Sequence, residues 1–275
     1  MDIVLIYISP NGTTQTTARL LGNAFTQYGH NVEFVNIGRT PWRNQPAELI
    51  DKIARADIAG FGSAAYHMEM LNPMIRLIHS LSSIPDPVNF RSFFFLNYSG
   101  ITTGKTFLDL SRQFTRLGRP VIGALKITAP HFHHPQPFPD EESRQLIRDF
   151  TAALERKNYE AMSVPTMQEQ FQPSTRKVHL IHPFIHWVGK IRELPITIDN
   201  QRCKQCGKCV RECPAAAITL NGHVSINFQT CLHCYHCVAA CPQEAVRCPV
   251  EKLDAMLESN IKMIGMEKPA NRFYC

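Results

Sequence analysis

The first 202 residues of this 275-residue chain contain no cysteine, and eight of the ten cysteines fall between Cys203 and Cys241. This crowding argues against a disulfide framework and indicates a group of metal ligands. The chain also lacks any run of about 18 uncharged apolar residues, so no membrane span is expected. It opens Met1-Asp2-Ile3, without the positive charge of a secretory leader, and a cytoplasmic location is the default expectation.

Neither sign of charge is in large excess. The formal net charge of +6 divides into +1 for residues 1–170, +3 for 171–202 and +2 for 203–275. No segment is basic enough to indicate nucleic-acid binding. An apolar fraction of 44%, with 14 glycines and 19 prolines, is typical of a folded protein, and the length suits two domains.

Short apolar runs alternate with amphipathic runs through residues 1–160, which predicts an α/β domain with a parallel sheet covered on both faces. The strand-like runs are Ile3–Ile8, Asn31–Ile37, Ile58–Ser63, Ser92–Asn97 and Val121–Ile127. The helical patterns are Thr14–Tyr28, Pro46–Arg55, Asn72–Leu81, Lys105–Leu117 and Glu141–Lys157. Residues 161–194 read as a connector, 195–250 as a small cysteine-rich domain, and 251–275 as a C-terminal helix, centred on Val250–Met263, with an uninformative tail.

The eight clustered cysteines follow one spacing twice, C-x2-C-x2-C-x3-C-P, with an offset of 28 residues. Three thiolates at intervals of three wrap one corner of an iron–sulfur cube, and the cysteine before the proline reaches the neighbouring cube. Two [4Fe-4S] clusters are therefore expected, and structural zinc is the weaker alternative because it has little use for a third cysteine at the same interval. The ligand sets are Cys203, Cys206, Cys209 and Cys241 for one cluster, and Cys231, Cys234, Cys237 and Cys213 for the other.

The region around these motifs, residues 195–250, resembles the bacterial two-cluster ferredoxins, which have a small α+β fold. Cys248 and Cys275 fall outside the pattern and are expected to be plain thiols.

The loop after the first predicted strand is a candidate phosphate site. Ser9-Pro10-Asn11-Gly12-Thr13-Thr14 leads directly into a helix, where free amides, hydroxyls and the positive end of the macrodipole converge. The alternative is a plain helix cap. The chain has neither G-x-G-x-x-G nor G-x4-G-K-[ST] at this place, which argues against a dinucleotide or a nucleoside triphosphate.

Ser9, Gly12 and Thr14 resemble the flavodoxin signature that binds the phosphate of FMN, with Asn11 at a position where that signature usually has threonine. The resemblance covers residues 1–160 and implies a flavodoxin-like, doubly wound, five-stranded parallel sheet of order 2-1-3-4-5. It also implies that the loops after the third and fourth strands hold the flavin ring. Those loops are Ser63, Ala64, Ala65, Tyr66 and His67, and Asn97, Tyr98, Ser99 and Gly100. Tyr66 and Tyr98 are the stacking candidates, or they simply pack with their hydroxyls in water.

Histidines give weaker signals. The run His131-Phe132-His133-His134 follows the fifth predicted strand and either overhangs the flavin or is an exposed polar loop. His179, His182 and His186 are assigned to packing, because Pro183 interrupts the helix that would align them.

Taken end to end, the chain resembles the flavodoxin–ferredoxin fusion proteins of anaerobic bacteria and archaea. The resemblance implies an internal electron relay between two [4Fe-4S] clusters and FMN that serves unidentified redox partner proteins. An alternative is an FMN-dependent reductase of a small acceptor such as a quinone, a nitro compound or an enoate. A third hypothesis is a docking module that has lost its flavin.

Overall fold

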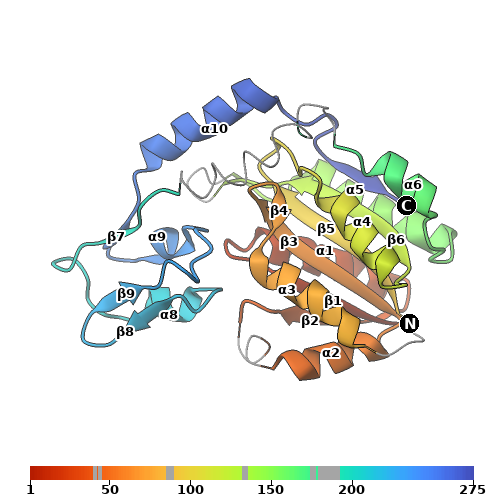
Figure 1. Cartoon of the computed structure of the whole chain (residues 1–275), viewed down its shortest axis with the longest axis horizontal. Coiled ribbons are helices and arrows are strands. Elements are labelled where there is room, and N and C mark those ends of the chain that lie inside the picture. The colour runs from red at the N-terminus through yellow and green to blue at the C-terminus, as the bar shows by residue number, and fades with distance from the viewer. Residues whose placement is uncertain (40–41, 43–44, 85–89, 132–135, 174–177, 179–192) are drawn as a thin grey trace.

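The computed structural model describes residues 1–39, 42, 45–84, 90–131, 136–173, 178 and 193–275. The first domain is a mainly parallel α/β sheet with helices on both faces, and a smaller domain lies beside it (Figure 1). A long helix, α10 (Val250–Ile264), connects the small domain back to the large one. None of the described helices is long and apolar enough to cross a membrane.

Five parallel strands form the body of the sheet in the order β2-β1-β3-β5-β6, which confirms the predicted order. Their bounds are β1 Asp2–Ile8, β2 Asn31–Asn36, β3 Ile58–Tyr66, β5 Arg91–Tyr98 and β6 Val121–Thr128. Four of the five are buried along nearly their whole length, because helices cover both faces. All five lie within three residues of the predicted runs.

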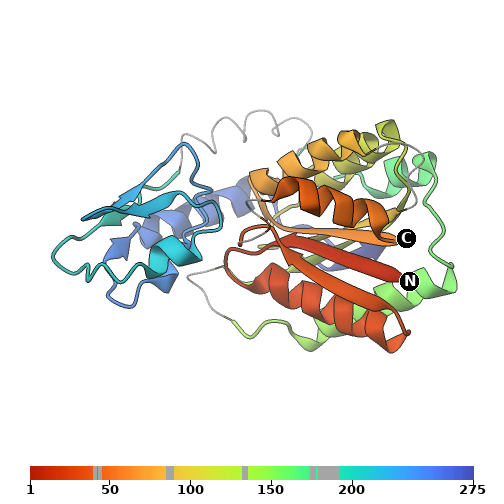
Figure 2. The ribbon, with the colours of Figure 1, turned by 90° about the horizontal axis from the view of Figure 1, so that it is seen from below.

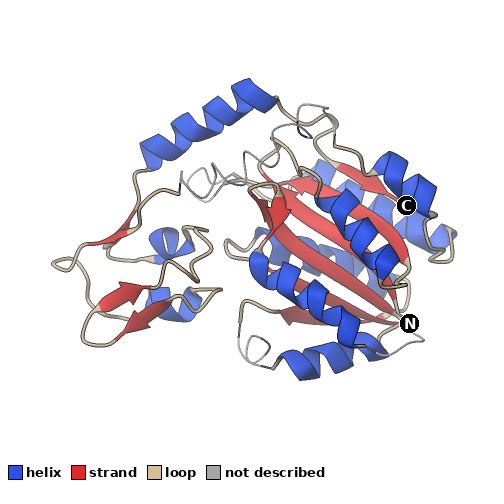
Figure 3. Ribbon diagram, in the orientation of Figure 1, coloured by secondary structure: helices blue, strands red, loops and turns tan. Residues whose placement is uncertain are grey.

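The two faces of the sheet bury alternate residues of each strand. In β1, Ile3 and Leu5 pack against α1 and α5, whereas Val4 and Ile6 pack into the opposite cluster with α2, α3 and α4. The helices are α1 Thr13–Gln27, α2 Pro46–Arg55, α3 Asn72–Ser80, α4 Thr106–Arg116 and α5 Glu141–Arg156. Figure 3 shows the sheet between these two layers.

Two short antiparallel strands extend the sheet beyond the five that the sequence predicts. β4 (Glu69–Met70) pairs with the end of β3, and β11 (Arg272–Tyr274) pairs with β6 at the edge. The tail, uninformative in sequence, is therefore part of the first domain's sheet, which has seven strands instead of five. Strands of two and three residues are too short to show a periodic pattern.

The small domain consists of two pairs of short antiparallel strands and two short helices. Strand β7 (Thr197–Ile198) pairs with β10 (Val246–Arg247), and β8 (Ile218–Leu220) pairs with β9 (Val224–Ile226). Helices α8 (Lys208–Glu212) and α9 (His236–Ala240) each carry the third cysteine of one motif. Seen from below in Figure 2, this domain and α10 lie to one side of the sheet.

Within the connector, α6 (Val164–Gln170) is helical, and Met167 and Phe171 pack into the first domain's core. His179, His182 and His186 lie outside the described residues, as do the basic connector residues 176–177 and 190–192.

Candidate functional site

Two small cavities in the second domain are each lined by four cysteines. Cys203, Cys206, Cys209 and Cys241 line the first, and Cys213, Cys231, Cys234 and Cys237 line the second. Each cavity therefore takes three cysteines from one motif and the last cysteine of the other. These are the two groups that the spacing predicts.

The two cysteine loops repeat the same strained backbone. Gln205, Gly207 and Ala216 have positive φ values of 53°, 70° and 51°. Their equivalents 28 residues later, His233, Tyr235 and Glu244, have φ values of 46°, 55° and 49°. Non-glycine residues rarely adopt this conformation, and its repetition at matching positions indicates that the site requires it.

Backbone amides point at the sulfur atoms in both loops. The N–H of Ala217 donates to Cys213 Sγ at 3.3 Å, and that of Ala245 donates to Cys241 Sγ at the same distance. Such bonds favour the thiolate form. For Cys241, burial raises the pKa, but the backbone hydrogen bonds around its sulfur together outweigh burial and lower it.

The second cavity is the more deeply buried of the two. Burial, helped by neighbouring thiols, raises the pKa of Cys234 and of Cys237 to about 12. A metal centre bound there must therefore displace protons. Within the described part of the chain, no three His, Cys, Asp or Glu side chains are placed to hold a single metal ion. The donor set is instead one of four thiols around a space, which suits a polynuclear cluster.

The phosphate loop leaves a hydroxyl unpaired at the start of α1. Thr14 is fully buried, and its Oγ1 has no hydrogen-bond partner. Gly12 has φ of 86°, with open space where a side chain would stand. Ser9 Oγ accepts a hydrogen bond from the backbone N–H of Gln15 at 3.0 Å. An unpaired buried donor beside a helix N-terminus fits the phosphate of FMN.

A cavity of about 240 Å³ extends from this loop across the carboxyl ends of the parallel strands. Its lining includes Asn11 and Thr13, the loop from Ala64 to His67, and residues Asn97, Tyr98 and Ser99. Ser9, Gly12, Thr14, Ser63 and Gly100, which the sequence also proposes, are not part of this lining. The cavity therefore joins most of the two loops predicted to hold a flavin ring to the predicted phosphate loop.

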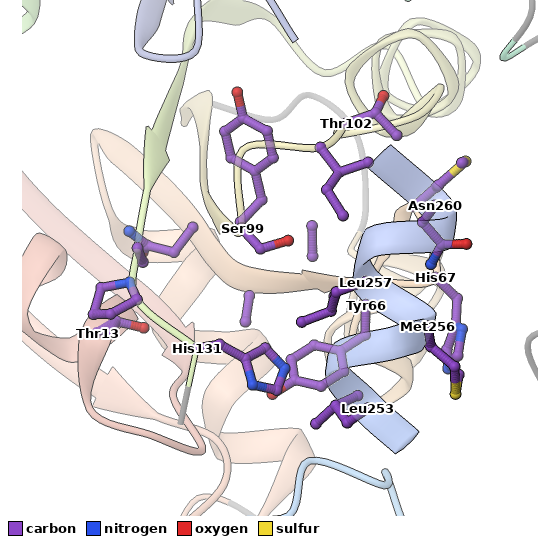
Figure 4. A pocket seen from close by; sticks show the side chains of 18 of the residues that line it. Thr13, Tyr66, His67, Ser99, Thr102, His131, Leu253, Met256, Leu257 and Asn260 are labelled. Carbon is purple, nitrogen blue, oxygen red and sulfur yellow. The ribbon is translucent and has the colours of Figure 1, made fainter. Parts of the chain in front are cut away.

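Helix α10 covers one side of this cavity. Figure 4 shows Leu253, Met256 and Leu257 along the helix, with Tyr66 and His131 beside them. Residues 132–135, the rest of the histidine run, lie outside the described residues. The sequence predicts the helix but not its position, although the spacing of Leu253, Leu257 and Ile264 marks one apolar face.

Tyr98 is held by the C-terminal tail. It is only 4% exposed, and its hydroxyl donates to the carbonyl of Ala270 at 2.5 Å. Burial and the nearby Glu267 raise its pKa. Tyr66 is half-buried and accepts a hydrogen bond from Asn11 Nδ2 at 3.3 Å. Of the two tyrosines, Tyr66 is therefore the one with more freedom to face a ring.

The second cysteine cavity lies against the first domain. Leu232, between two of its cysteines, packs on the core of the large sheet. Burial raises the pKa of Tyr66, and the nearby Cys234 and Tyr235 raise it further. An ion pair between Arg39 Nη2 and Glu212 Oε2, at 2.5 Å, also joins the domains. Sequence reasoning missed this contact, because Arg39 follows a strand with no motif around it.

Comparisons with known proteins found one matching family model and several similar solved structures. Residues 195–242 match the family model described as a 4Fe-4S dicluster domain. A flavodoxin from the domain Archaea is 18% identical over 57% of this chain and 98% of its own, with a TM-score of 0.45. Flavodoxin 1 from Bacillus cereus is 14% identical over 57% and 98%, with a TM-score of 0.43. No curated protein matches the chain in sequence.

A rubredoxin oxygen:oxidoreductase from Desulfovibrio gigas is 18% identical over 57% of this chain and 37% of its own, with a TM-score of 0.44. The sheet order, the loop at its carboxyl edge and the dicluster match together describe a flavodoxin-like domain fused to a ferredoxin-like domain.

Proposed function

We propose that this chain is an internal electron relay in which two [4Fe-4S] clusters and one FMN are held side by side. The observation that carries the proposal is the contact of the second cysteine motif with the first domain, where His236 Nδ1 lies 3.2 Å from Asn11 Oδ1 and Leu232 packs on the core of the sheet. Iron–sulfur clusters pass single electrons, and a flavin accepts one or two, so together they connect one-electron and two-electron partners.

The cysteines are assigned by the cavities that they line. The first cluster would be held by Cys203, Cys206, Cys209 and Cys241, and the second by Cys213, Cys231, Cys234 and Cys237. Residues 195–250 are the cluster domain, and residues 1–160 are the flavin domain, to which we add the returning strand β11.

The flavin-site residues have separate tasks. Ser9, Asn11, Gly12, Thr13 and Thr14 would hold the phosphate through amides and hydroxyls at the start of α1. The ring would lie between two loops, which are Ser63, Ala64, Ala65, Tyr66 and His67, and Asn97, Tyr98, Ser99 and Gly100. Helix α10 would exclude water from one side of it.

The reductase alternative has one specific observation in its favour. The cavity is covered by α10, and Met256, Leu257 and Asn260 line it together with His67 and His131. On the side that α10 covers, a small acceptor fits beside the ring more easily than a protein partner. Under this alternative the clusters supply electrons to a small molecule inside the cavity.

The experiment is an anaerobic purification followed by analysis of iron, sulfide and flavin, and then a redox titration. Visible spectra would follow the flavin, and EPR would follow the clusters. We expect about eight irons, eight sulfides and one FMN per chain, from the two-cluster rule. Zinc without sulfide would overturn the cluster assignment. If the purified protein contained no FMN, the hypothesis of a docking module that has lost its flavin would be the one left.

The second part of the experiment separates relay from reductase. Reduced holoprotein would be mixed with a quinone, a nitro compound or an enoate, and separately with oxidised redox proteins. Fast oxidation by proteins alone supports the relay. Fast, saturable oxidation by one small acceptor supports the reductase.

A further inference from the structure

The two cysteine cavities differ in what surrounds them. The second is lined by apolar residues such as Ile196, Ile218 and Leu232, and by no charged side chain. The first is lined by Lys204 and Lys208 and by no carboxylate. One cavity therefore lies in an apolar interior beside the first domain, and the other opens to a cationic surface.

The first cavity is also the more accessible. Cys206 is exposed, and so are its neighbours Lys204 and Gln205. The other seven clustered cysteines are buried or partly buried. An exposed ligand brings one edge of a bound centre to the protein surface, where a second protein can approach it.

The cations at this edge are largely uncompensated. Arg202 and Arg247 pair with Asp199 at 3.9 and 3.5 Å, and Arg202 also lies 3.7 Å from Glu244, so these four charges offset one another. Among the described residues, no carboxylate pairs with Lys204 or Lys208. Arg211 Nη1 donates to the carbonyl of Cys206 at 3.1 Å and adds a third positive charge to the same edge.

We infer that the exposed edge formed by Lys204, Cys206, Lys208 and Arg211 is the docking surface for an acidic one-electron redox protein. The inference rests on the proposed function and adds the entry point and the partner's charge. A positive rim attracts a negative partner and raises the rate of encounter. Helix α10 covers one side of the flavin cavity, whereas Cys206 is exposed, so this edge is the more accessible end of the relay.

Only electrons are exchanged between the two proteins at this surface. One electron passes per encounter, so the partner is oxidised by one electron as the centre at Cys206 is reduced by one, or the reverse. No bond forms or breaks, and two encounters are needed for each two-electron change at the flavin.

The test measures binding, with the anaerobic holoprotein and two probes of opposite charge. The acidic probe is a strongly acidic flavodoxin, and the basic probe is cytochrome c. Calorimetric titrations would be run at low and at high salt. The variant is Lys204→Glu with Lys208→Glu, and the matched control is Arg112→Glu with Arg116→Glu on the exposed face of α4, which makes the same change in net charge.

We expect the acidic probe to bind the wild type at low salt and to weaken as salt rises. The lysine variant should bind at least about tenfold more weakly and lose most of that salt dependence, since rim charges act mainly through long-range attraction. The α4 control should bind like the wild type. Equal losses in both variants would show a general charge effect and overturn the inference.

Two further outcomes overturn it. One is tighter binding of cytochrome c than of the acidic probe, and the other is unchanged binding of the acidic probe by the lysine variant. A milder variant, Lys204→Gln, keeps the test informative if the double reversal fails to fold. Iron, sulfide and flavin contents report on the proposed function, whereas these affinities report on the docking surface alone.

Discussion

Asn11 and His236 meet across the domain boundary, with His236 Nδ1 lying 3.2 Å from Asn11 Oδ1. The side-chain nitrogen of Asn11, Nδ2, donates a hydrogen bond to the hydroxyl of Tyr66 at 3.3 Å. We propose these two contacts as the reason for asparagine at position 11, where the flavodoxin signature usually has threonine. A threonine at position 11 has a single hydroxyl, whereas an amide can contact the cysteine loop with its oxygen and the flavin-site tyrosine with its nitrogen.

The substitution Asn11→Thr should therefore separate flavin binding from domain docking. It restores the usual phosphate loop but loses the contact with His236, and one hydrogen bond is worth about 1 kcal/mol, roughly a fivefold change in the docked population. We expect unchanged FMN content and slower electron exchange between clusters and flavin after flash reduction. Arg39→Gln, which removes the ion pair to Glu212, should act in the same direction. An exchange rate equal to the wild type would contradict this role for Asn11.

Cysteine substitutions test the crossed ligand sets. Cys241 belongs to the second motif in sequence but lines the first cavity. We expect Cys241→Ser to disturb the same cluster as Cys206→Ser, and Cys213→Ser to disturb the same cluster as Cys237→Ser. EPR spectra of the reduced variants, with iron analysis, would distinguish the pairs. If Cys241→Ser instead matched Cys237→Ser, each motif would hold its own cluster.

The substitution Thr14→Val tests the phosphate site. Its buried hydroxyl has no partner in the protein, so it is free to donate to a phosphate, and a hydrogen bond to a charged group is worth about 1.5–3 kcal/mol. FMN affinity should fall by roughly 10- to 150-fold. Riboflavin has no phosphate and should bind wild type and variant alike. Thr26→Val, whose hydroxyl bonds Gly22 inside α1, is the matched control. An equal loss of affinity for FMN and for riboflavin would show that the Thr14 hydroxyl does not contact the phosphate.

Charge near the first cavity should also tune its cluster. Lys204 and Lys208 favour the more negative, reduced state, so their positive charges raise the reduction potential. Lys208→Gln should lower the potential of the cluster with exposed Cys206 and leave the other nearly unchanged. A titration followed by EPR would measure both. A change in the reduction potential of the buried cluster alone would show that Lys208 does not act on the cluster in the first cavity.

Sequence periodicity was sufficient for the five parallel strands and the five helices that cover them, because each is long enough to show its own pattern, whereas β4 and β11 are too short. Helix α2 occupies Pro46–Arg55, the predicted bounds, since a proline at its first position and an apolar stripe mark it. The cysteine groups were predictable for a different reason, because a cluster imposes a strict spacing on its ligands.

The cover of the flavin site could not be predicted in this way. It depends on where α10 and the last ten residues dock, and docking between distant segments leaves no local period. Lys126 on β6 gives no signal for its partner, since Glu267 is 141 residues away. A single lysine in an apolar strand is the one hint, because such a charge requires a partner.

That buried pair gives the last prediction. Lys126 Nζ lies 3.2 Å from Glu267 Oε1, and both side chains are under 5% exposed. Glu267 also accepts the amide N–H of Thr103 at 3.1 Å. Glu267→Ala leaves a buried charge without its partner, which costs about 3–5 kcal/mol. For a domain of this size that corresponds to a fall on the order of 10 °C in the melting temperature of the holoprotein, measured by calorimetry.

The double substitution Lys126→Met with Glu267→Leu removes both charges together. Because apolar side chains can replace a buried pair at little cost, it should recover the part of the loss that comes from the unpaired charge, while the Thr103 amide stays without its acceptor in both variants. The single variant should also release flavin more readily, since the tail that holds Tyr98 is anchored by this pair. If the double variant melts as low as Glu267→Ala, packing of the tail rather than charge pairing accounts for the loss.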